Sequence, residues 1–440
     1  MSKRILYILV VLALAWSFMT DVQAKSKKKG RCSGQTAMQV ASQMWPGWNL
    51  GNTMEGGTYD HEWTDKAGVD SEVSWQKTRT TRELFAFVRQ QGFRSVRIPC
   101  AWAMGHVSGP DECEVDVAWL NRVQQLVDWC LEENLYVIIN QHWDGGWLEH
   151  DGVTDSADVA TKQKQLASIW RQIAQRFRNY DQRLLFAGMN EPAVGGPSPA
   201  VKGNLLKDQE LSDRICLYQQ TFIDAVRATG GRNADRILVV QGPNTNIDLT
   251  CQYDYFPRLR DRACKRLMME VHYYDPYQFS GMREDADWGK MWYYWGSNNK
   301  GSEGRNTVDS QNEGHVKEQM EKLMNRYVRQ GVPVVLGEYA AEQRWPVGQD
   351  PIHDASIRDY YHTITLEAIN HGVLPFVWDA NYHPGMTIID RTALKVANPS
   401  MMTGIQKARA EAVWPNDCCE KTVKPPRLLN RHTDYTQPLC

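Results

Sequence analysis

The sequence predicts an α/β fold, a single (β/α)8 TIM barrel with long loops at one rim. Eight short apolar runs alternate with segments of helical periodicity, which is the pattern of βα units. The run at 184–189 is apolar at nearly every position, as expected for a parallel strand covered on both faces. Polar residues directly follow many of these runs. Because the carboxyl ends of all strands in such a barrel meet at one rim, these residues are predicted to converge.

The predicted elements follow one another along the chain without a break that resembles an interdomain linker. The first strand and its turn are predicted at 44–52, and the other strands at 95–99, 136–140, 184–189, 237–241, 267–272, 333–337 and 374–378. The helices are predicted near 80–91, 117–133, 166–177, 211–229, 316–330, 357–371 and 399–413. The helix at 117–133 has apolar residues at helical spacing, and Gly92 is placed to end the helix before it. Long loops at 53–78 and 273–313 contain several aromatic residues.

Composition and missing motifs exclude several classes of protein. No Gly-x-Gly-x-x-Gly or phosphate-binding loop follows a predicted strand, which disfavours the alternative fold, a doubly wound open sheet. The 440-residue chain has a formal net charge of −2, so neither nucleic acid nor an anionic membrane is an expected partner. Its 17 tryptophans fit a surface that stacks on flat ligands such as sugar rings, although many are expected in the core.

Residues 1–24 have the pattern of a signal peptide. Lys3 and Arg4 form a charged start, an apolar run follows at 5–19, and small residues precede a cleavage site after Ala24. The alternative is an uncleaved membrane anchor, but the apolar run is shorter than the roughly 20 residues that span a bilayer. We therefore expect a secreted or periplasmic protein that has no membrane attachment after cleavage.

Ten cysteines in an exported chain indicate some disulfide bonds. Two pairs bracket short connections and are predicted to be bonded: Cys100–Cys113 and Cys251–Cys264. A further bond could join the two ends of the chain, from Cys32 to Cys418, Cys419 or Cys440. Two cysteines in helical patterns are expected to be buried thiols, Cys130 and Cys216. No cluster of cysteine and histidine has the spacing of a zinc site.

Two of the apolar runs end in a glutamate. Glu191 follows the strand at 184–189, and Glu338 follows the strand at 333–337. Two carboxylates that face each other across a sugar are the groups that retaining glycoside hydrolysis needs. Each has an ordinary explanation by itself, since Asn-Glu-Pro, for example, can simply begin a helix. Several other polar or aromatic residues also lie at or just beyond strand ends: Arg97, His142, Asn190, His272 and Trp378. The coincidence of all of them at one rim predicts a functional site.

These motifs resemble glycoside hydrolase family 5, a large family of cellulases and mannanases. The resemblance extends from about Trp45 to Asp390 and depends on Val96-Arg97-Ile98-Pro99, Asn140-x-His142, Asn190-Glu191-Pro192, His272-x-Tyr274, Gly337-Glu338 and Trp378. The stretch Trp48-Asn49-Leu50-Gly51-Asn52 and the pair Trp378-Asp379 resemble the endoglucanase-like members. Many members have two histidines in the third-strand motif, whereas here Trp143 stands in the second place.

The resemblance implies that Glu191 is the general acid/base and Glu338 the nucleophile. An acid must be protonated, so Glu191 is expected in a less polar setting that raises its pKa. Glu338 must stay ionised, and Arg97 is the nearest candidate cation. The implied substrate-binding set is Arg97, His142, Trp143, Asn190, His272, Tyr274, Trp378, Asn49 and Trp147. Trp143, Trp147 and the aromatic residues at 288–295 are candidates for neighbouring sugar subsites, with core or loop packing as the alternative.

We therefore expect a monomeric enzyme with one catalytic domain at 25–415 and a C-terminal tail at 416–440 packed on the barrel. The expected activity is that of a retaining endo-β-1,4-glucanase acting on a polysaccharide, without a metal or cofactor in the site. A β-mannanase, a xyloglucanase or a mixed-linkage β-glucanase would use the same catalytic residues. A sugar-binding barrel without turnover would lose a carboxylate, and the presence of both argues against it. An esterase or a metallohydrolase is disfavoured because Gly-x-Ser-x-Gly and His-Glu-x-x-His are missing, while a structural calcium ion in the acidic loops stays open.

Overall fold

A computed structural model describes residues 34–57, 68–109, 113–196, 203–381 and 384–415 of the chain. The chain divides into two units, 1–35 and 36–440, and the described structure belongs almost entirely to the second. The predicted signal peptide and C-terminal tail lie outside the described residues. No helix in the described part is both long enough and apolar enough to cross a membrane.

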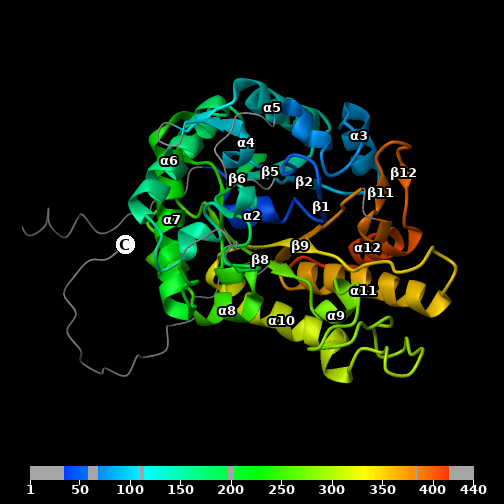
Figure 1. Cartoon of the computed structure of the whole chain (residues 1–440). Helices are drawn as coiled ribbons and strands as arrows, with labels where there is room; N and C mark the ends of the chain where they lie inside the picture. The colour runs from blue at the N-terminus through cyan, green and yellow to red at the C-terminus, as the bar shows by residue number, and fades with distance from the viewer. Residues whose placement is uncertain (1–33, 58–67, 110–112, 197–202, 382–383, 416–440) are drawn as a thin grey trace, which may run out of the picture. The chain divides into compact units, whose positions relative to one another are not determined.

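Eight parallel strands close into a barrel, which confirms the predicted fold (Figure 1). In chain order they are β1 (Gly47–Asn49), β2 (Ser95–Ile98), β5 (Tyr136–Asn140), β6 (Leu184–Ala187), β7 (Leu238–Gln241), β8 (Leu267–Tyr273), β9 (Val334–Tyr339) and β10 (Val373–Val377). Each strand pairs with its neighbours in the chain order of these eight, and β1 closes the barrel against β10. Most lie within a residue or two of the sequence prediction, and β1 lies inside the 44–52 stretch predicted as the first strand and its turn.

Helices surround the barrel, with α5 to α7 on one side and α10 to α12 on the other (Figure 1). The larger helices are α3 (Arg82–Gln90), α5 (Val117–Glu132), α6 (Val159–Arg176), α7 (Asp208–Ala228), α10 (Glu313–Arg326), α11 (Pro351–Asn370) and α12 (Pro399–Glu411). Aspartate side chains cap the N-termini of α5, α6 and α11 by accepting backbone N–H groups. The sequence prediction missed α8 (Ile247–Gln252), because six residues are too few to show helical periodicity.

Several smaller elements complete the described structure. Two short hairpin-like pairs lie outside the barrel, β3 (Val107–Ser108) with β4 (Glu114–Val115), and β11 (Ile389–Asp390) with β12 (Lys395–Val396). Three short helices are α2 (Ala37–Ala41), α4 (Ala103–His106) and α9 (Tyr277–Ser280). Of these, α2 packs at the N-terminal end of the barrel and α9 belongs to the long loop after β8.

Strand side chains alternate between two apolar layers, as the period of a β-strand requires. The outward-facing residues pack with the helices in one large buried cluster. The inward-facing residues form a second cluster, which also includes Ala37, Val40 and Ala41 of α2. Its other members are Met44, Ile138, Leu185, Ala187, Ile237, Val239, Met268, Val335, Leu374 and Phe376. The backbone N–H of Ala37 donates to the carbonyl of Lys265, just before β8, at 2.9 Å. The helix α2 therefore closes the N-terminal end of the barrel.

The two predicted local disulfide bonds are wrong. Cys100 carries a free thiol at the end of β2, and that thiol turns back to donate to the carbonyl of Ile98 at 3.2 Å instead of reaching Cys113. Cys251 is also a free thiol, and burial raises its pKa to about 11, whereas Cys264 is bonded in a disulfide that does not include Cys251. Two other cysteines are buried in α5 and α7, as predicted: Cys130 and Cys216. The proposed partners at the chain ends lie outside the described residues.

Candidate active site

The alternation that builds the apolar interior also builds a polar layer above it. On β8, Met268 faces the interior, so Glu270 and His272 lie on the same face two and four positions further along. On β5, the same step leads from Ile138 to Asn140. Glu270 and Asn140 are fully buried, and His272 is nearly so. The C-terminal end of the barrel interior is therefore filled with polar and charged side chains.

Arg97 of β2 is the centre of this layer and has no exposed surface. Its Nη1 atom donates to Glu338 Oε1 at 2.9 Å and to Asn49 Oδ1 at 3.0 Å. Its Nη2 atom donates to Asn190 Oδ1 at 2.7 Å, and its Nε atom lies 3.1 Å from Glu270 Oε1. A buried guanidinium is tolerated only when anions and acceptors compensate its lost hydration. Arg97 thus joins residues of five different strand ends into one network.

Glu338 lies at the C-terminal end of β9 and is held on both carboxylate oxygens. Besides the bond from Arg97 to Oε1, the hydroxyl of Tyr274 donates to Oε2 at 2.9 Å. Burial raises the pKa of Glu338, and the positive charges of His272 and Arg97 oppose that rise. A residue with a side chain does not fit at the preceding Gly337, because a Cβ atom there would lie 2.0 Å from Glu270 Oε1. The carboxylate is therefore fixed in orientation.

Glu191 is bound through His272. The Nδ1 atom of His272 lies 2.7 Å from Glu191 Oε1, and its Nε2 atom lies 3.3 Å from Glu270 Oε1. Burial alone would favour the neutral ring, but Glu338 and the hydrogen bonds to Glu191 and Glu270 raise the pKa of His272 to about 10. A protonated imidazole donates from both nitrogens, so His272 connects the exposed carboxylate to the buried one.

The two glutamates are close together. One oxygen of Glu191, one oxygen of Glu338 and one ring nitrogen of His272 all lie within 4.8 Å of one another. Carboxyl groups about 5–5.5 Å apart suit a retaining glycosidase, whereas an inverting enzyme needs about 6.5–9.5 Å to admit a water molecule. Glu191 was expected in the less polar setting, but it is the more exposed of the two. Its side chain is 25% exposed, whereas that of Glu338 is 6% exposed. Glu338 belongs to a strand, whereas Glu191 follows the end of β6 and reaches into the open cleft.

Two further buried carboxylates were not recognised as site residues from the sequence. Glu149, in the loop after β5, accepts the backbone N–H groups of Asn190 and of Glu191, the latter at 2.8 Å. Burial raises the pKa of Glu149 to about 8. A buried acidic residue in a loop has no periodic pattern that would reveal it. For Glu270 a signal existed, because a charged residue interrupts an otherwise apolar strand.

His142 and Trp378 form a second, less charged wall of the site. Their rings stack with centroids 5.9 Å apart and an angle of 13° between their planes. Burial lowers the pKa of His142, and the nearby charges of Arg97 and His272 lower it further. The Nδ1 atom of His142 lies 3.1 Å from the side-chain amide of Asn140. The two histidines of the site therefore differ in charge, and the ring of His142 is neutral.

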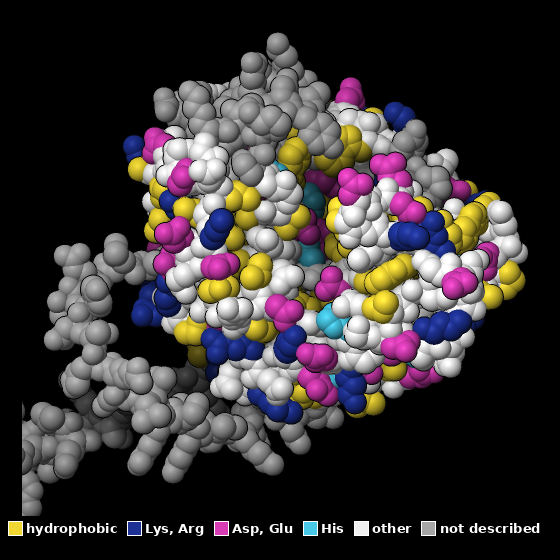
Figure 2. Space-filling view, turned by 60° about the horizontal axis from the view of Figure 1, so that its bottom comes forward, with side chains coloured by type: hydrophobic (Ala, Val, Ile, Leu, Met, Phe, Trp, Pro, Cys, Tyr) yellow, Lys and Arg dark blue, Asp and Glu magenta, His cyan; other side chains and the backbone are white. Residues whose placement is uncertain are grey.

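An open cleft of about 870 Å3 exposes these groups. Figure 2 shows a hollow in this face in which histidine and acidic side chains gather. Six residues predicted from the sequence or its resemblance line the cleft together: His142, Glu191, His272, Tyr274, Glu338 and Trp378. Long loops after β7 and β8 form much of the remaining wall. The structure thus brings the predicted catalytic pair and its closest partners to one solvent-accessible site.

Other predicted substrate-binding residues lie elsewhere. Asn49 and Arg97 are completely buried, so they position other groups and cannot touch a substrate. The Asn49 amide donates to the carbonyl of Gly337 at 2.8 Å, directly before Glu338. Asn190 is almost fully buried and meets Arg97. The described lining of the cleft does not include the remaining two, Trp143 and Trp147.

The positions of these two tryptophans have a local explanation. Trp147 is buried, donates to Asp144 Oδ2 at 3.3 Å, and has Lys162 Nζ 5.3 Å from its ring centroid. Trp143 meets His150 edge to face, with ring centroids 6.1 Å apart. Both rings follow β5 and pack within its loop, which is the alternative that the sequence left open.

Among the described residues, Glu191, His272 and Glu338 have the spacing of a metal site. Both ring nitrogens of His272 already face carboxylates, those of Glu191 and Glu270, and Glu338 is already bonded to Arg97 and Tyr274. The charges of the cluster are thus balanced by protein cations. The donor set does not fit a resident metal ion.

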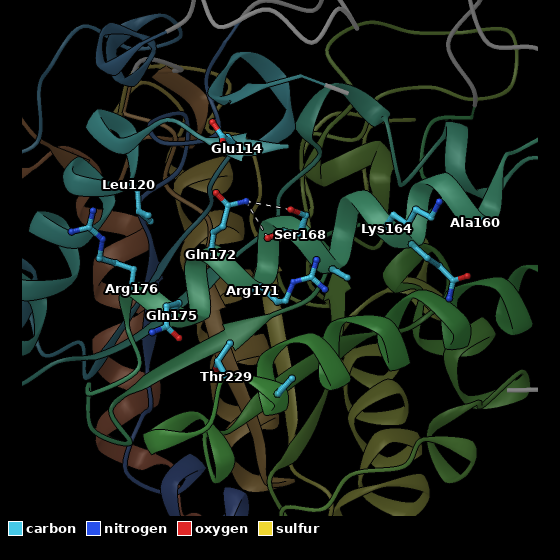
Figure 3. Close-up of a pocket in the computed structure, with 13 residues that line it drawn as sticks. Glu114, Leu120, Ala160, Lys164, Ser168, Arg171, Gln172, Gln175, Arg176 and Thr229 are labelled. Carbon is cyan, nitrogen blue, oxygen red and sulfur yellow. Dashed lines mark hydrogen bonds between the residues drawn. The ribbon is translucent and has the colours of Figure 1, made fainter. Parts of the chain in front are cut away.

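A second hollow of about 1360 Å3 lies on the outer helical layer, along α6 (Figure 3). Its described lining contains one carboxylate, Glu114, and no aromatic ring. Within it the Gln172 amide donates to the backbone carbonyl of Ser168 at 3.2 Å and to its hydroxyl at 3.4 Å, as Figure 3 shows. Without a carboxylate pair or a stacking surface, this groove offers none of the chemistry found in the cleft.

The barrel and the cleft together define the class of the protein. A closed (β/α)8 barrel with two adjacent carboxylates at the C-terminal rim, one buried and one partly exposed, is the arrangement of a glycoside hydrolase. Comparison with known sequences agrees, because residues 58–384 match the family described as Cellulase (glycosyl hydrolase family 5). The chain belongs to this family.

Characterised relatives cover most of the chain. It is 32% identical over 377 residues to the xyloglucan-specific endo-β-1,4-glucanase BoGH5A of Bacteroides ovatus, covering 84% of this chain and 70% of the relative. It is 31% identical over 391 residues to endoglucanase A of Paenibacillus barcinonensis, covering 84% and 90%. Among solved structures, a xyloglucan-specific β-1,4-glucanase from a ruminal metagenomic library, XEG5B in complex with XXLG, is 37% identical, with a TM-score of 0.77 and coverage of 91% and 100%.

Proposed function

We propose that this glycoside hydrolase is a retaining endo-β-1,4-glucanase in which Glu338 is the nucleophile and Glu191 the acid/base. The observation that supports this most directly is the approach of the two carboxylates to within 4.8 Å. Their environments support the assignment of roles. Glu338 is oriented by Arg97 and Tyr274 within the barrel end, whereas Glu191 has exposed surface from which it can reach a leaving group.

In the first step, an oxygen of Glu338 attacks the anomeric carbon and the glycosidic bond breaks. Glu191 enters this step protonated and transfers that proton to the departing oxygen, so the leaving sugar is released with a free hydroxyl group. The product is a glycosyl ester of Glu338 and an ionised Glu191.

In the second step, Glu191 takes a proton from a water molecule that attacks the same carbon from the opposite side. The ester bond to Glu338 breaks, both glutamates return to their starting states, and the configuration of the sugar is retained after two inversions. Glu149 and His272 hold Glu191 through its backbone and its carboxylate during both proton transfers. Arg97 stays beside Glu338 and stabilises the carboxylate when it is released.

The proposed substrate is a β-1,4-linked glucan that is cut internally. An open cleft accommodates a chain that extends past the site in both directions, whereas a closed pocket would hold a chain end. Xyloglucan, a branched β-1,4-glucan, is the second candidate substrate. It is supported by the similarity to two xyloglucan-specific relatives at 32% and 37% identity.

A panel of polysaccharides tests this proposal. Carboxymethyl cellulose, barley β-glucan, xyloglucan, glucomannan and mannan would be digested, and viscosity would be followed together with new reducing ends. We expect rapid loss of viscosity on at least one β-1,4-glucan, with the β-anomer as the first product seen by NMR. Hydrolysis of mannan alone would contradict the proposed substrate, and an α-anomer as first product would contradict the retaining mechanism.

We also propose that the enzyme acts as a monomer outside the cytoplasm. The charged and apolar pattern of residues 1–24 supports export. N-terminal sequencing of the protein recovered from culture medium or periplasm should find a start at Lys25. Light scattering of the same material should give the mass of one chain. An intact N-terminus or a dimer mass would contradict the respective proposal.

A further inference from the structure

Two aromatic side chains line the cleft and yet remain largely in water. Tyr277 is 52% exposed and Trp288 is 63% exposed, and both belong to the lining of the cleft. Their rings stack on each other, with centroids 6.3 Å apart and planes 28° from parallel. The other large apolar side chains that the structure describes as exposed are all aliphatic. An exposed apolar patch at a cleft is typical of a binding surface rather than of packing.

The long loop after β8 holds this aromatic pair rigidly. The guanidinium of Arg344 donates to four backbone carbonyls of the loop, at distances of 2.7 to 3.2 Å: Gln278, Phe279, Met282 and Trp292. Tyr277 begins α9, and its ring lies so close to Gly281 that a Cβ atom there would be 2.4 Å from the ring. The loop segment that contains Tyr277 is therefore fixed before any ligand arrives.

The turn that contains Trp288 is held separately. The backbone groups of Ala286 and Gly289 bond to each other on either side of the tryptophan, at 2.9 and 3.0 Å. Asp285 accepts a hydrogen bond from each terminal nitrogen of Arg305, at 2.6 and 3.0 Å. This contact lowers the pKa of Asp285 to about 2. A surface that is already ordered loses little conformational entropy on binding.

The chemistry of the surface selects a sugar ring. The two faces of a pyranose are covered by C–H bonds and stack on aromatic rings, while its hydroxyl groups point outward from the edge. Arg283 and Glu284 line the cleft beside the pair and can hydrogen-bond to such hydroxyl groups. Resting on the proposed glucanase activity, we infer that Tyr277 and Trp288 form an outer sugar-binding subsite. It takes a pyranose ring of the glucan beyond the rings held at Glu191 and Glu338.

The subsite predicts a dependence on substrate length. Trp288→Ala, Tyr277→Ala and the double variant would be compared with the wild type on short and long cello-oligosaccharides. We expect Trp288→Ala to lower the ratio of kcat/KM on long substrates to that on the shortest by roughly tenfold, mainly through KM. Trp288→Phe keeps an aromatic face and should recover most of this ratio. Val308→Ala alters a side chain of the same loop that is 49% exposed but outside the cleft lining, and should leave the ratio unchanged.

Xyloglucan oligosaccharides of matched backbone length show which ring is bound. An equal loss on linear and branched substrates assigns a backbone ring, and a loss confined to branched substrates assigns a branch ring. Calorimetric titration of the same oligosaccharides into Glu338→Gln, with and without Trp288→Ala, should show the loss as weaker binding. If the wild type cuts glucans and the double variant keeps both its ratio and its affinity, the inference is overturned while the proposed activity stands. If the wild type cuts no β-glucan, the proposed activity fails and the titration still decides the subsite.

Discussion

The two ends of the barrel differ in chemistry although the same strands build both. At the N-terminal end, α2 and inward-facing residues such as Leu185 and Phe376 form a dry apolar cluster. At the C-terminal end, the inward-facing layer contains polar and charged side chains, and Arg97 and Glu270 are completely buried. A step of two residues along a strand leads from one environment to the other. The comparison separates the part of the barrel that stabilises the fold from the part that is arranged for chemistry.

The energetic consequences of the two ends are opposite. Burial of an aliphatic side chain stabilises the folded state by about 1.5–3 kcal/mol. Burial of a charge costs free energy that its partners only partly return, so a charged layer adds little stability and persists where function needs it. Changes at the apolar end should therefore reduce stability and spare catalysis. Changes at the charged end should do the reverse, and the following predictions test this contrast from the largest effect to the smallest.

The largest effect is expected from Glu338→Ala. Loss of the nucleophile should reduce turnover of both polysaccharide and activated aryl glycosides by about 10^5-fold. Azide can enter the cavity and attack the substrate directly, so the product should be the α-glycosyl azide. NMR of the product identifies the anomer, and circular dichroism checks that the barrel remains folded. A β-glycosyl azide would exchange the roles of the two glutamates.

A smaller and more selective loss is expected from Glu191→Ala. Polysaccharide cleavage should fall by about 10^3-fold, because a poor leaving group needs protonation as its bond breaks. The first step on an aryl glycoside with a good leaving group should be largely spared and appear as a burst in rapid-quench kinetics. Azide should intercept the covalent intermediate and give the β-glycosyl azide. The assignment of the acid would fail if both substrates lost activity equally.

At the apolar end, Leu185→Ala should act on stability alone. Its side chain has no exposed surface, and its removal should cost about 2–5 kcal/mol of unfolding free energy. Scanning calorimetry and urea unfolding measure the loss, while kcat at a temperature where the variant is folded should stay near the wild-type value. Val117→Ala is the matched control, since that side chain is 63% exposed and should change neither quantity. A large fall in kcat for Leu185→Ala would break the contrast between the two ends.

An effect of similar size but opposite sign is expected from Glu149→Gln, which sharpens the comparison because stability should increase. The folded-state pKa of about 8 lies above the ordinary value of 4.5, so the unfolded chain releases this proton first as pH rises. Wild-type stability should therefore fall by up to about 1.4 kcal/mol per pH unit between those two values. The amide keeps an acceptor for the Glu191 N–H but does not titrate, so the variant should lack this slope and be more stable than the wild type at pH 8. Equal pH profiles of the melting temperature in both proteins would contradict the prediction.

Much of this molecule could be predicted because the relevant signals are local. The apolar runs and helical repeats locate the strands and most larger helices, and a strand's end locates the residue that follows it. The sequence therefore predicted that five residues lie at one rim before their contacts were known: Glu191, Glu338, His142, His272 and Trp378. A barrel has only one rim where the carboxyl ends of its strands can meet. Their convergence thus follows from the fold class itself.

Contacts between distant loops were decided only by the tertiary structure. No pattern showed that Glu149 would bind the backbone of Glu191, or that Cys100 would turn back toward its own strand. The aromatic residues show the same limit, because Trp147 is buried while Trp288 faces the cleft. Sequence periodicity reports which face of a regular element is buried. The direction of a loop side chain depends on contacts with segments far away in the chain, and these form only when the barrel closes.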